Sequence, residues 1–201
     1  MTIATDIERH PLEPFLPRGA KILLLGSFPP PKRRWSMNFF YPNYSNDMWR
    51  IMGVLFFGRA DHFILAGRKK FDYDAVVDFC RTEGIALFDT ASAVRRLREN
   101  ASDKFLEVVE PTDLEALLDR VPECRAVATT GERATETLAA KYGCVKPAVG
   151  AKTEITIGGR RLDFWRMPSS SRAYPLPLER KAAEYAKLFD HKTDSSNIQH
   201  N

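Results

Sequence analysis

Short apolar runs alternate with amphipathic stretches along most of this 201-residue chain. Three of these runs predict buried strands of a parallel sheet, because they have continuously apolar centres and are only four to six residues long. They lie at residues 21–25, 85–88 and 125–130. Two later runs, 153–157 and 160–166, flank Gly158-Gly159, which is a strong signal for a two-residue β-hairpin turn.

Stretches with helical periodicity and capping residues separate the predicted strands. Asn46 or Ser45 can cap a helix that runs to about residue 57, and Thr112 with Glu115 forms a capping box for a helix to about residue 120. The other predicted helices cover residues 72–83, 131–142 and 178–188. Strands that alternate with helices predict an α/β fold, a three-layer αβα arrangement around a mainly parallel central sheet.

Length and composition favour one domain over residues 1–190. The chain is 44% hydrophobic and 28% charged, which is typical of globular proteins with one sizeable core. Three prolines predict an extended lead-in over residues 1–19, and the polar residues 191–201 predict a disordered tail. No apolar run could span a bilayer and no signal peptide is evident, so we expect a cytoplasmic monomer with no membrane partner.

The cysteines and histidines argue against a metal site. Cys80, Cys124 and Cys144 are widely spaced, without a CxxC pair, and the four histidines are scattered. An odd number of cysteines without a signal peptide fits reduced thiols. We therefore expect neither a metal nor an iron–sulfur cluster, and no cofactor.

The positions of the basic residues say more than the net charge of +4. Residues 32–34 and 95–98 each hold several basic side chains, and Arg166 and Arg172 flank a late serine-rich loop. A solvated surface would explain any one of these clusters. Three clusters beside one inferred sheet edge favour a phosphate-binding rim instead.

Two loops at opposite ends of the sequence carry the candidate chemistry. Gly26-Ser27-Phe28-Pro29 follows the first strand and leads through Phe40 and Tyr41 to Asn46. The second loop, residues 168–172, follows the last strand and offers three successive serines. In an open α/β sheet, ligands bind where the carboxyl ends of the strands release their loops. Aromatic planes with carboxamides and hydroxyls suit a flat ligand with polar edges, such as a nucleobase.

Each candidate also has a simpler structural explanation. Asn46 can cap a helix while Trp49 packs in the core, and Asp89 can cap the turn after its strand. A serine nucleophile in residues 169–171 is rejected, because the chain has no GxSxG elbow and no histidine placed as its base. Hydroxyls and backbone amides that bind a phosphate fit this loop better.

In their order and spacing, these motifs resemble the uracil-DNA glycosylase superfamily. Gly26-Ser27-Phe28-Pro29-Pro30 is similar to the GxxPG/GxxPP motif that follows the first strand. Ser45-Asn46-Asp47-Met48-Trp49, after Phe40-Tyr41, is similar to the stretch (H/N)PxNxFW. Met167-Pro168-Ser169-Ser170 is similar to the late (H/L)PS motif. The similarity covers roughly residues 20–188.

Within the superfamily, the chain looks most like the mismatch-specific and hypoxanthine-type branches. The uracil-excising branches place an Asp or Asn in the first motif to orient the attacking water, where this chain has Ser27 and Phe28. The hypoxanthine-type enzymes use an Asn just before the Trp-containing helix, which Asn46 matches. Met167 stands where the late motif of the uracil branches commonly begins with His.

The resemblance implies a monofunctional DNA glycosylase of base-excision repair. Such an enzyme flips a deaminated or mismatched base out of DNA and hydrolyses its N-glycosidic bond. The implied catalytic residue is Asn46, which would orient a water. The implied base-binding residues are Gly26, Ser27, Phe28, Phe40, Tyr41 and Asp89. The implied phosphate-binding residues are Pro168, Ser169, Ser170, Ser171, Arg172 and Arg166.

Two other functions fit the same motifs. The chain could be a non-catalytic module that recognises modified bases or single strands, which the missing motif residues favour. It could also be a hydrolase or transferase that acts on free nucleosides in the same pocket.

Overall fold

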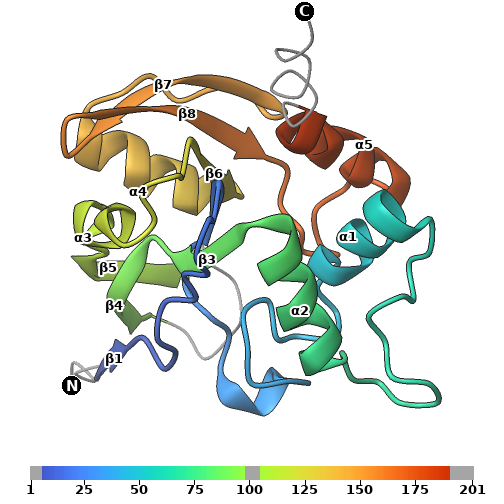
Figure 1. Cartoon of the computed structure of the whole chain (residues 1–201). Coiled ribbons are helices and arrows are strands. Elements are labelled where there is room, and N and C mark those ends of the chain that lie inside the picture. The colour runs from blue at the N-terminus through green and yellow to red at the C-terminus, as the bar shows by residue number, and fades with distance from the viewer. Residues whose placement is uncertain (1–5, 98–104, 191–201) are drawn as a thin grey trace, which may run out of the picture.

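The computed structural model describes residues 6–97 and 105–190, and its strands form two sheets. The central sheet has five strands in the order β3-β2-β6-β8-β7 (Figure 1). Its strands are β2 (Ile22–Gly26), β3 (Ile85–Asp89), β6 (Ala126–Thr130), β7 (Ala151–Ile157) and β8 (Arg160–Met167). β3, β2, β6 and β8 run parallel, and β7 is antiparallel to β8.

The apolar runs explain the middle of this sheet. Every residue of β2, β3 and β6 is buried, as expected for strands that are covered on both faces. The predicted hairpin is confirmed, because Gly158 and Gly159 adopt φ values of +55° and +75° between β7 and β8. Two successive positive φ values are what a type I′ turn requires.

Helices cover both faces of the central sheet. α3 and α4 lie on one side, and α1, α2 and α5 lie on the other (Figure 1). The bounds are α1 (Met48–Phe57), α2 (Tyr73–Glu83), α3 (Leu114–Asp119), α4 (Glu132–Tyr142) and α5 (Leu178–Phe189), with the short 3-10 helix η1 at Lys32–Arg34. The α/β class and the helical layers agree with the prediction from the sequence.

A second sheet corrects the expectation of a mainly parallel architecture. β1 (Ile7–Arg9), β4 (Ala91–Arg96) and β5 (Leu106–Pro111) form an antiparallel sheet in the order β1-β4-β5. β4 begins two residues after β3 ends, so the chain passes directly from one sheet to the other. Together with the antiparallel edge strand β7, this makes the β-structure mixed rather than mainly parallel.

The N-terminal segment packs more closely than a loose lead-in would. Besides forming β1, it pairs with the outer edge of β3, where Phe15 and Leu87 exchange two backbone hydrogen bonds of 3.0 and 2.9 Å. This pairing covers an edge strand that would otherwise present unpaired backbone groups. The predicted tail, residues 191–201, lies outside the described residues. Within the described residues, no helix combines the length and apolarity needed to cross a membrane.

Two predicted helix starts are shifted. Asp113, rather than Thr112, caps α3 by accepting a hydrogen bond from the Ala116 amide. The Thr112 hydroxyl instead donates to the backbone oxygen of Asp89. The first predicted helix begins at Met48, after the Asn46 position expected to cap it.

Candidate functional site: a cavity at the carboxyl edge of the central sheet

A cavity of about 950 Å³ opens where β2, β3, β6 and β8 end. Each of these strands contributes a lining residue at or next to its carboxyl end. The cavity brings together all thirteen residues that the motifs predicted to form a site, namely Gly26, Ser27, Phe28, Phe40, Tyr41, Asn46, Asp89, Arg166, Pro168, Ser169, Ser170, Ser171 and Arg172. Their roles are not tested by this placement.

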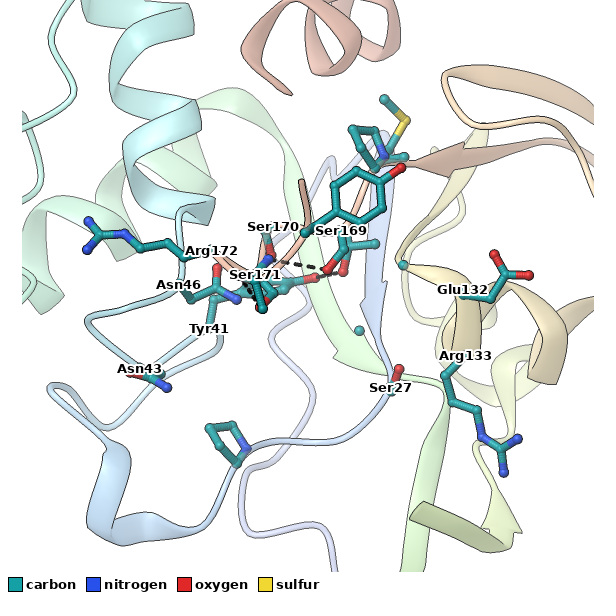
Figure 2. A pocket seen from close by; sticks show the side chains of 18 of the residues that line it. Ser27, Tyr41, Asn43, Asn46, Glu132, Arg133, Ser169, Ser170, Ser171 and Arg172 are labelled. Carbon is teal, nitrogen blue, oxygen red and sulfur yellow. Dashed lines mark hydrogen bonds between the residues drawn. The ribbon is translucent and has the colours of Figure 1, made fainter. Parts of the chain in front are cut away.

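Backbone contacts join the two loops of the site. The Asp47 amide donates to the Ser170 oxygen over 2.8 Å, and Asn46 and Ser171 form an isolated antiparallel bridge. Figure 2 shows the Asn46 side chain beside Ser169, Ser170 and Ser171, although more than 120 residues of sequence separate these segments. The Asn46 segment and the serine loop therefore form one structural unit.

The Asn46 side chain is held by one hydrogen bond just before α1. Its Oδ1 accepts a 2.8 Å hydrogen bond from the Met48 amide at the start of α1. Its main-chain oxygen accepts from the guanidinium of Arg50, which also packs over the ring of Tyr44. Among the described residues, no acceptor contacts the Asn46 amide nitrogen. The hydrogen bond from the Met48 amide thus fixes the orientation of the side chain, which keeps its second oxygen lone pair and its NH₂ group for a ligand.

A buried ion pair ties α5 to both loops. Lys181 is 1% exposed, and its ammonium contacts Asp47 Oδ2 at 3.1 Å and donates to the Ser171 oxygen at 2.8 Å. Arg172 contacts the other Asp47 oxygen at 3.0 Å, with half of its side chain exposed. Arg172 can therefore turn part of its guanidinium toward a ligand while Asp47 holds it in place.

The other predicted phosphate-binding arginine is already paired. The Arg166 guanidinium contacts the Glu132 carboxylate and donates to the Pro147 oxygen. The hydrogen bond from Lys146, together with the charge of Arg166, keeps the pKa of Glu132 below its usual value. Glu132 and Glu136 both line the cavity, and the sequence did not indicate either one. An incoming phosphate would have to compete with Glu132 for Arg166.

The other basic clusters divide between the cavity and the second sheet. Arg34 of η1 lines the cavity. Arg95 and Arg96, in contrast, pair with Glu107 and Glu8 in the antiparallel sheet and do not line the cavity. The prediction that residues 95–98 contribute to a phosphate-binding rim is wrong for these two arginines, because carboxylates on the neighbouring strands form ion pairs with their guanidinium groups. Arg98 lies outside the described residues.

Aromatic side chains form one wall of the cavity. Phe28 and Phe40 are buried but line it, and the Trp49 indole donates to the Phe40 oxygen over 3.1 Å. Tyr41 has a φ of +49°, which is uncommon for a residue with a side chain, and its hydroxyl lies 3.0 Å from Thr130 Oγ1. Such strain recurs at functional sites, where the surrounding contacts hold it.

Polar groups without partners lie in the same cavity. Ser27 Oγ and Arg133 Nε are buried and have no hydrogen-bond partner in the described part of the chain. An unsatisfied buried polar atom is costly in a folded protein, so its presence in a cavity suggests a ligand or water partner. The sequence indicated Ser27 through its motif, whereas Arg133 and the lining residue Asn43 were missed because they stand outside the motifs.

The serine loop is held by local hydrogen bonds. The Ser171 amide donates to Ser169 Oγ, and the Ala173 amide donates to Ser171 Oγ, both over 3.2 Å. Tyr185 of α5 donates to the Pro168 oxygen over 3.0 Å. The loop is therefore ordered before any ligand arrives.

Metal or thiol chemistry has little support in the described residues. Across residues 6–97 and 105–190, no group of three or more His, Cys, Asp or Glu side chains could hold a metal ion. Burial raises the pKa of Cys80 and, to about 11, that of Cys124, so both thiols stay protonated.

Comparison with known proteins supports the resemblance suggested by the motifs. No protein-family model matches the sequence. A hypoxanthine DNA glycosylase of Methanosarcina acetivorans is 25% identical over 176 residues, covering 88% of this chain and 94% of that protein. A solution NMR structure from the same organism, described as a candidate uracil DNA glycosylase, superposes with a TM-score of 0.59 at 24% identity. It covers 92% of this chain and 98% of that one. The chain therefore resembles the uracil-DNA glycosylase superfamily in sequence and in fold.

Proposed function

We propose that this protein is a DNA glycosylase that hydrolyses the N-glycosidic bond of a deaminated or mismatched base in base-excision repair. The observation that carries the proposal is the direct joining of the Asn46 loop to the serine loop at a cavity lined by aromatic and polar residues. The similarity to a hypoxanthine DNA glycosylase supports the same function and makes hypoxanthine the first base to test.

In the proposed reaction, the target nucleotide leaves the stack and its base enters the cavity. Unstacking costs on the order of a few kcal/mol and least for a mispaired base. Phe40 or Phe28 stacks on the base, and the unpartnered Ser27 hydroxyl bonds to a polar atom of its edge. Stacking a base on an aromatic side chain contributes about 1–3 kcal/mol, which offsets much of the unstacking cost.

Asn46 positions the attacking water. Cleavage of the glycosidic bond builds positive charge on the sugar, so a well-placed water needs no strong base. Because the Met48 amide occupies one lone pair of Asn46 Oδ1, the plane of the carboxamide is fixed. The second lone pair can accept a hydrogen bond from the water and hold it against the sugar.

The serine loop and the arginines bind the flanking phosphates. The hydroxyls of residues 169–171 and the backbone amides of Ser169 and Ser170 supply neutral donors, and Arg172 supplies charge. Among the described residues no lysine lines the cavity, and the nearby ammonium of Lys181 is buried in its ion pair. A free amine for a covalent intermediate is therefore missing from the described cavity, which supports a monofunctional enzyme.

An excision assay tests the proposal. Duplexes with a single hypoxanthine, xanthine, uracil or mismatched thymine should release at least one of these bases. Borohydride should trap no covalent protein–DNA product. Binding to DNA without release of any base would favour the non-catalytic module, and cleavage of free nucleosides alone would favour the nucleoside hydrolase.

Substitution of Glu132 should tighten DNA binding. In Glu132→Gln the Arg166 guanidinium loses its carboxylate partner and can bind a phosphate, so we expect a several-fold gain in affinity at moderate salt. The slope of log K against log salt should steepen by up to about 0.9, the value for one additional phosphate contact.

The control for this measurement is Glu154→Gln. Glu154 pairs with the exposed Arg161 on the hairpin and does not line the cavity, so its loss should leave affinity and slope unchanged. Equal affinities of Glu132→Gln and the wild-type protein would show that Arg166 does not contact DNA.

A further inference from the structure

His10 is a buried histidine behind the wall of the cavity. Its Nε2 lies 2.9 Å from Asp89 Oδ2, and the two side chains are only 4% and 9% exposed. Its ring packs against Phe28, Phe40 and Phe88, with ring centroids 5.3, 6.1 and 4.4 Å away. Asp89, Phe28 and Phe40 line the cavity, so His10 supports three of its residues from behind.

The backbone of Leu12 accommodates a His10 ring that donates from Nε2 to Asp89. His10 Nδ1 lies 2.9 Å from the Leu12 oxygen and 3.2 Å from the Leu12 nitrogen. Leu12 can therefore satisfy Nδ1 both in the imidazolium and in the neutral ring that carries its hydrogen on Nε2. In both of these forms Nε2 donates a hydrogen bond to Asp89 Oδ2.

The second oxygen of Asp89 is free for a ligand. Across the described residues no donor contacts Asp89 Oδ1, which packs over Gly26. A Cβ on Gly26 would lie 2.4 Å from this oxygen, so only glycine leaves it room at the carboxyl end of β2. An ionised carboxylate accepts hydrogen bonds and donates none. In its ionised form Asp89, which lines the cavity, can therefore pair through Oδ1 only with a donor.

We propose that His10 is a positioning residue that keeps Asp89 an acceptor in the cavity, and that Asp89 Oδ1 takes the one free ring N–H of a deaminated base. This inference rests on the proposed function. Within a nucleoside, hypoxanthine carries one ring N–H, at N1, and uracil carries one, at N3. Adenine and cytosine present a bare acceptor nitrogen at the same places, which a carboxylate would repel.

This pairing has a consequence for which bases the cavity accepts. The His10–Asp89 pair rejects adenine and cytosine, from which the deaminated bases arise. It does not reject guanine or thymine, which also carry a ring N–H, and these bases must be discriminated by the cost of breaking their pairs with the opposite strand.

Nucleoside binding in wild-type protein and two His10 variants tests the proposal. His10→Gln can place an amide donor near Asp89, whereas His10→Phe fills the ring site and donates nothing. By NMR titration, wild-type protein and His10→Gln should bind deoxyinosine at least about tenfold more tightly than deoxyadenosine, because adenine N1 would leave the Asp89 acceptor without its donor. In His10→Phe the two affinities should become nearly equal.

The control variant is His62→Phe. His62 stacks on Phe57 at the end of α1 and does not line the cavity, so its loss should leave the preference unchanged. Wild-type protein that binds both nucleosides equally would overturn the proposal. So would a folded His10→Phe protein that keeps the wild-type preference.

A measurement on unmodified protein covers the case in which His10→Phe does not fold. The ¹⁵N spectrum of the His10 ring at neutral pH should show a hydrogen on Nε2, and a bare Nε2 would overturn the proposal. These experiments need no excision. A protein that prefers deoxyinosine but releases no base from DNA would contradict the proposed function and leave the role of His10 intact.

Discussion

The Asn46→Ala variant is expected to lose base excision while it still binds DNA. Removing the carboxamide leaves the attacking water without its acceptor, and misplacing a reactant by about 1 Å can cost a rate factor on the order of 100. We therefore expect single-turnover excision to fall at least about 100-fold. Phosphate contacts supply most of the affinity for DNA, so the dissociation constant should change by less than about threefold.

Loss of the hydrogen bond to the Met48 amide must be separated from loss of the water contact. Asn46→Ala removes the acceptor for this amide, which should lower the free energy of unfolding by about 0.5–1.5 kcal/mol. Asn46→Asp is the matched control for this effect, because an Asp side chain can accept the same local backbone hydrogen bond as Asn. Its unfolding in urea should match that of the wild-type protein. A folded Asn46→Ala protein with wild-type excision would refute the catalytic role.

The central sheet could be predicted from the sequence because its strands are buried on both faces. Such strands appear as continuous apolar runs, as at residues 22–25, where the pattern does not depend on the neighbouring element. The β7–β8 hairpin could also be predicted, since two glycines between two apolar runs favour a two-residue turn in which both residues have a positive φ. The ends of these strands then located the cavity, because parallel strands release their loops at one edge.

The antiparallel sheet could not be predicted in the same way. β1 has three residues, and β4 ends in two arginines that suggested an exposed rim. Their carboxylate partners, Glu8 and Glu107, lie on the neighbouring strands and are distant in sequence. The arginines were assigned to phosphate binding because a lone sequence does not show which charges meet across strands.

The same reason explains why the sequence did not indicate His10, which contacts the cavity residues Asp89, Phe28 and Phe40. His10 lies 79 residues from Asp89 and belongs to a proline-containing segment that predicts only an extended path. Its role follows from the aromatic rings that enclose it and from the backbone of Leu12. Sequence motifs indicated the residues that line the cavity along its two loops. They could not indicate the groups that hold those residues from behind.

The Lys181→Met variant is expected to show the largest loss of stability. Methionine keeps the length of the side chain but removes the buried ammonium from Asp47 and from the Ser171 oxygen. Removing one partner of a buried ion pair typically costs about 3–5 kcal/mol, because the other charge stays buried. Arg172 still contacts Asp47, so we expect the lower end, about 3 kcal/mol, from urea unfolding.

A second lysine on the same helix gives the control for that measurement. Lys187 pairs with Glu184 at the surface, where such a pair contributes about 0–1 kcal/mol, so Lys187→Met should unfold almost like the wild-type protein. Lys181→Met should also slow excision in conditions where it is fully folded, since Lys181 holds the loop that carries Ser171 against Asp47 next to Asn46. A loss of stability below 1 kcal/mol, equal to that of Lys187→Met, would mean that α5 does not hold the two loops together through this ion pair.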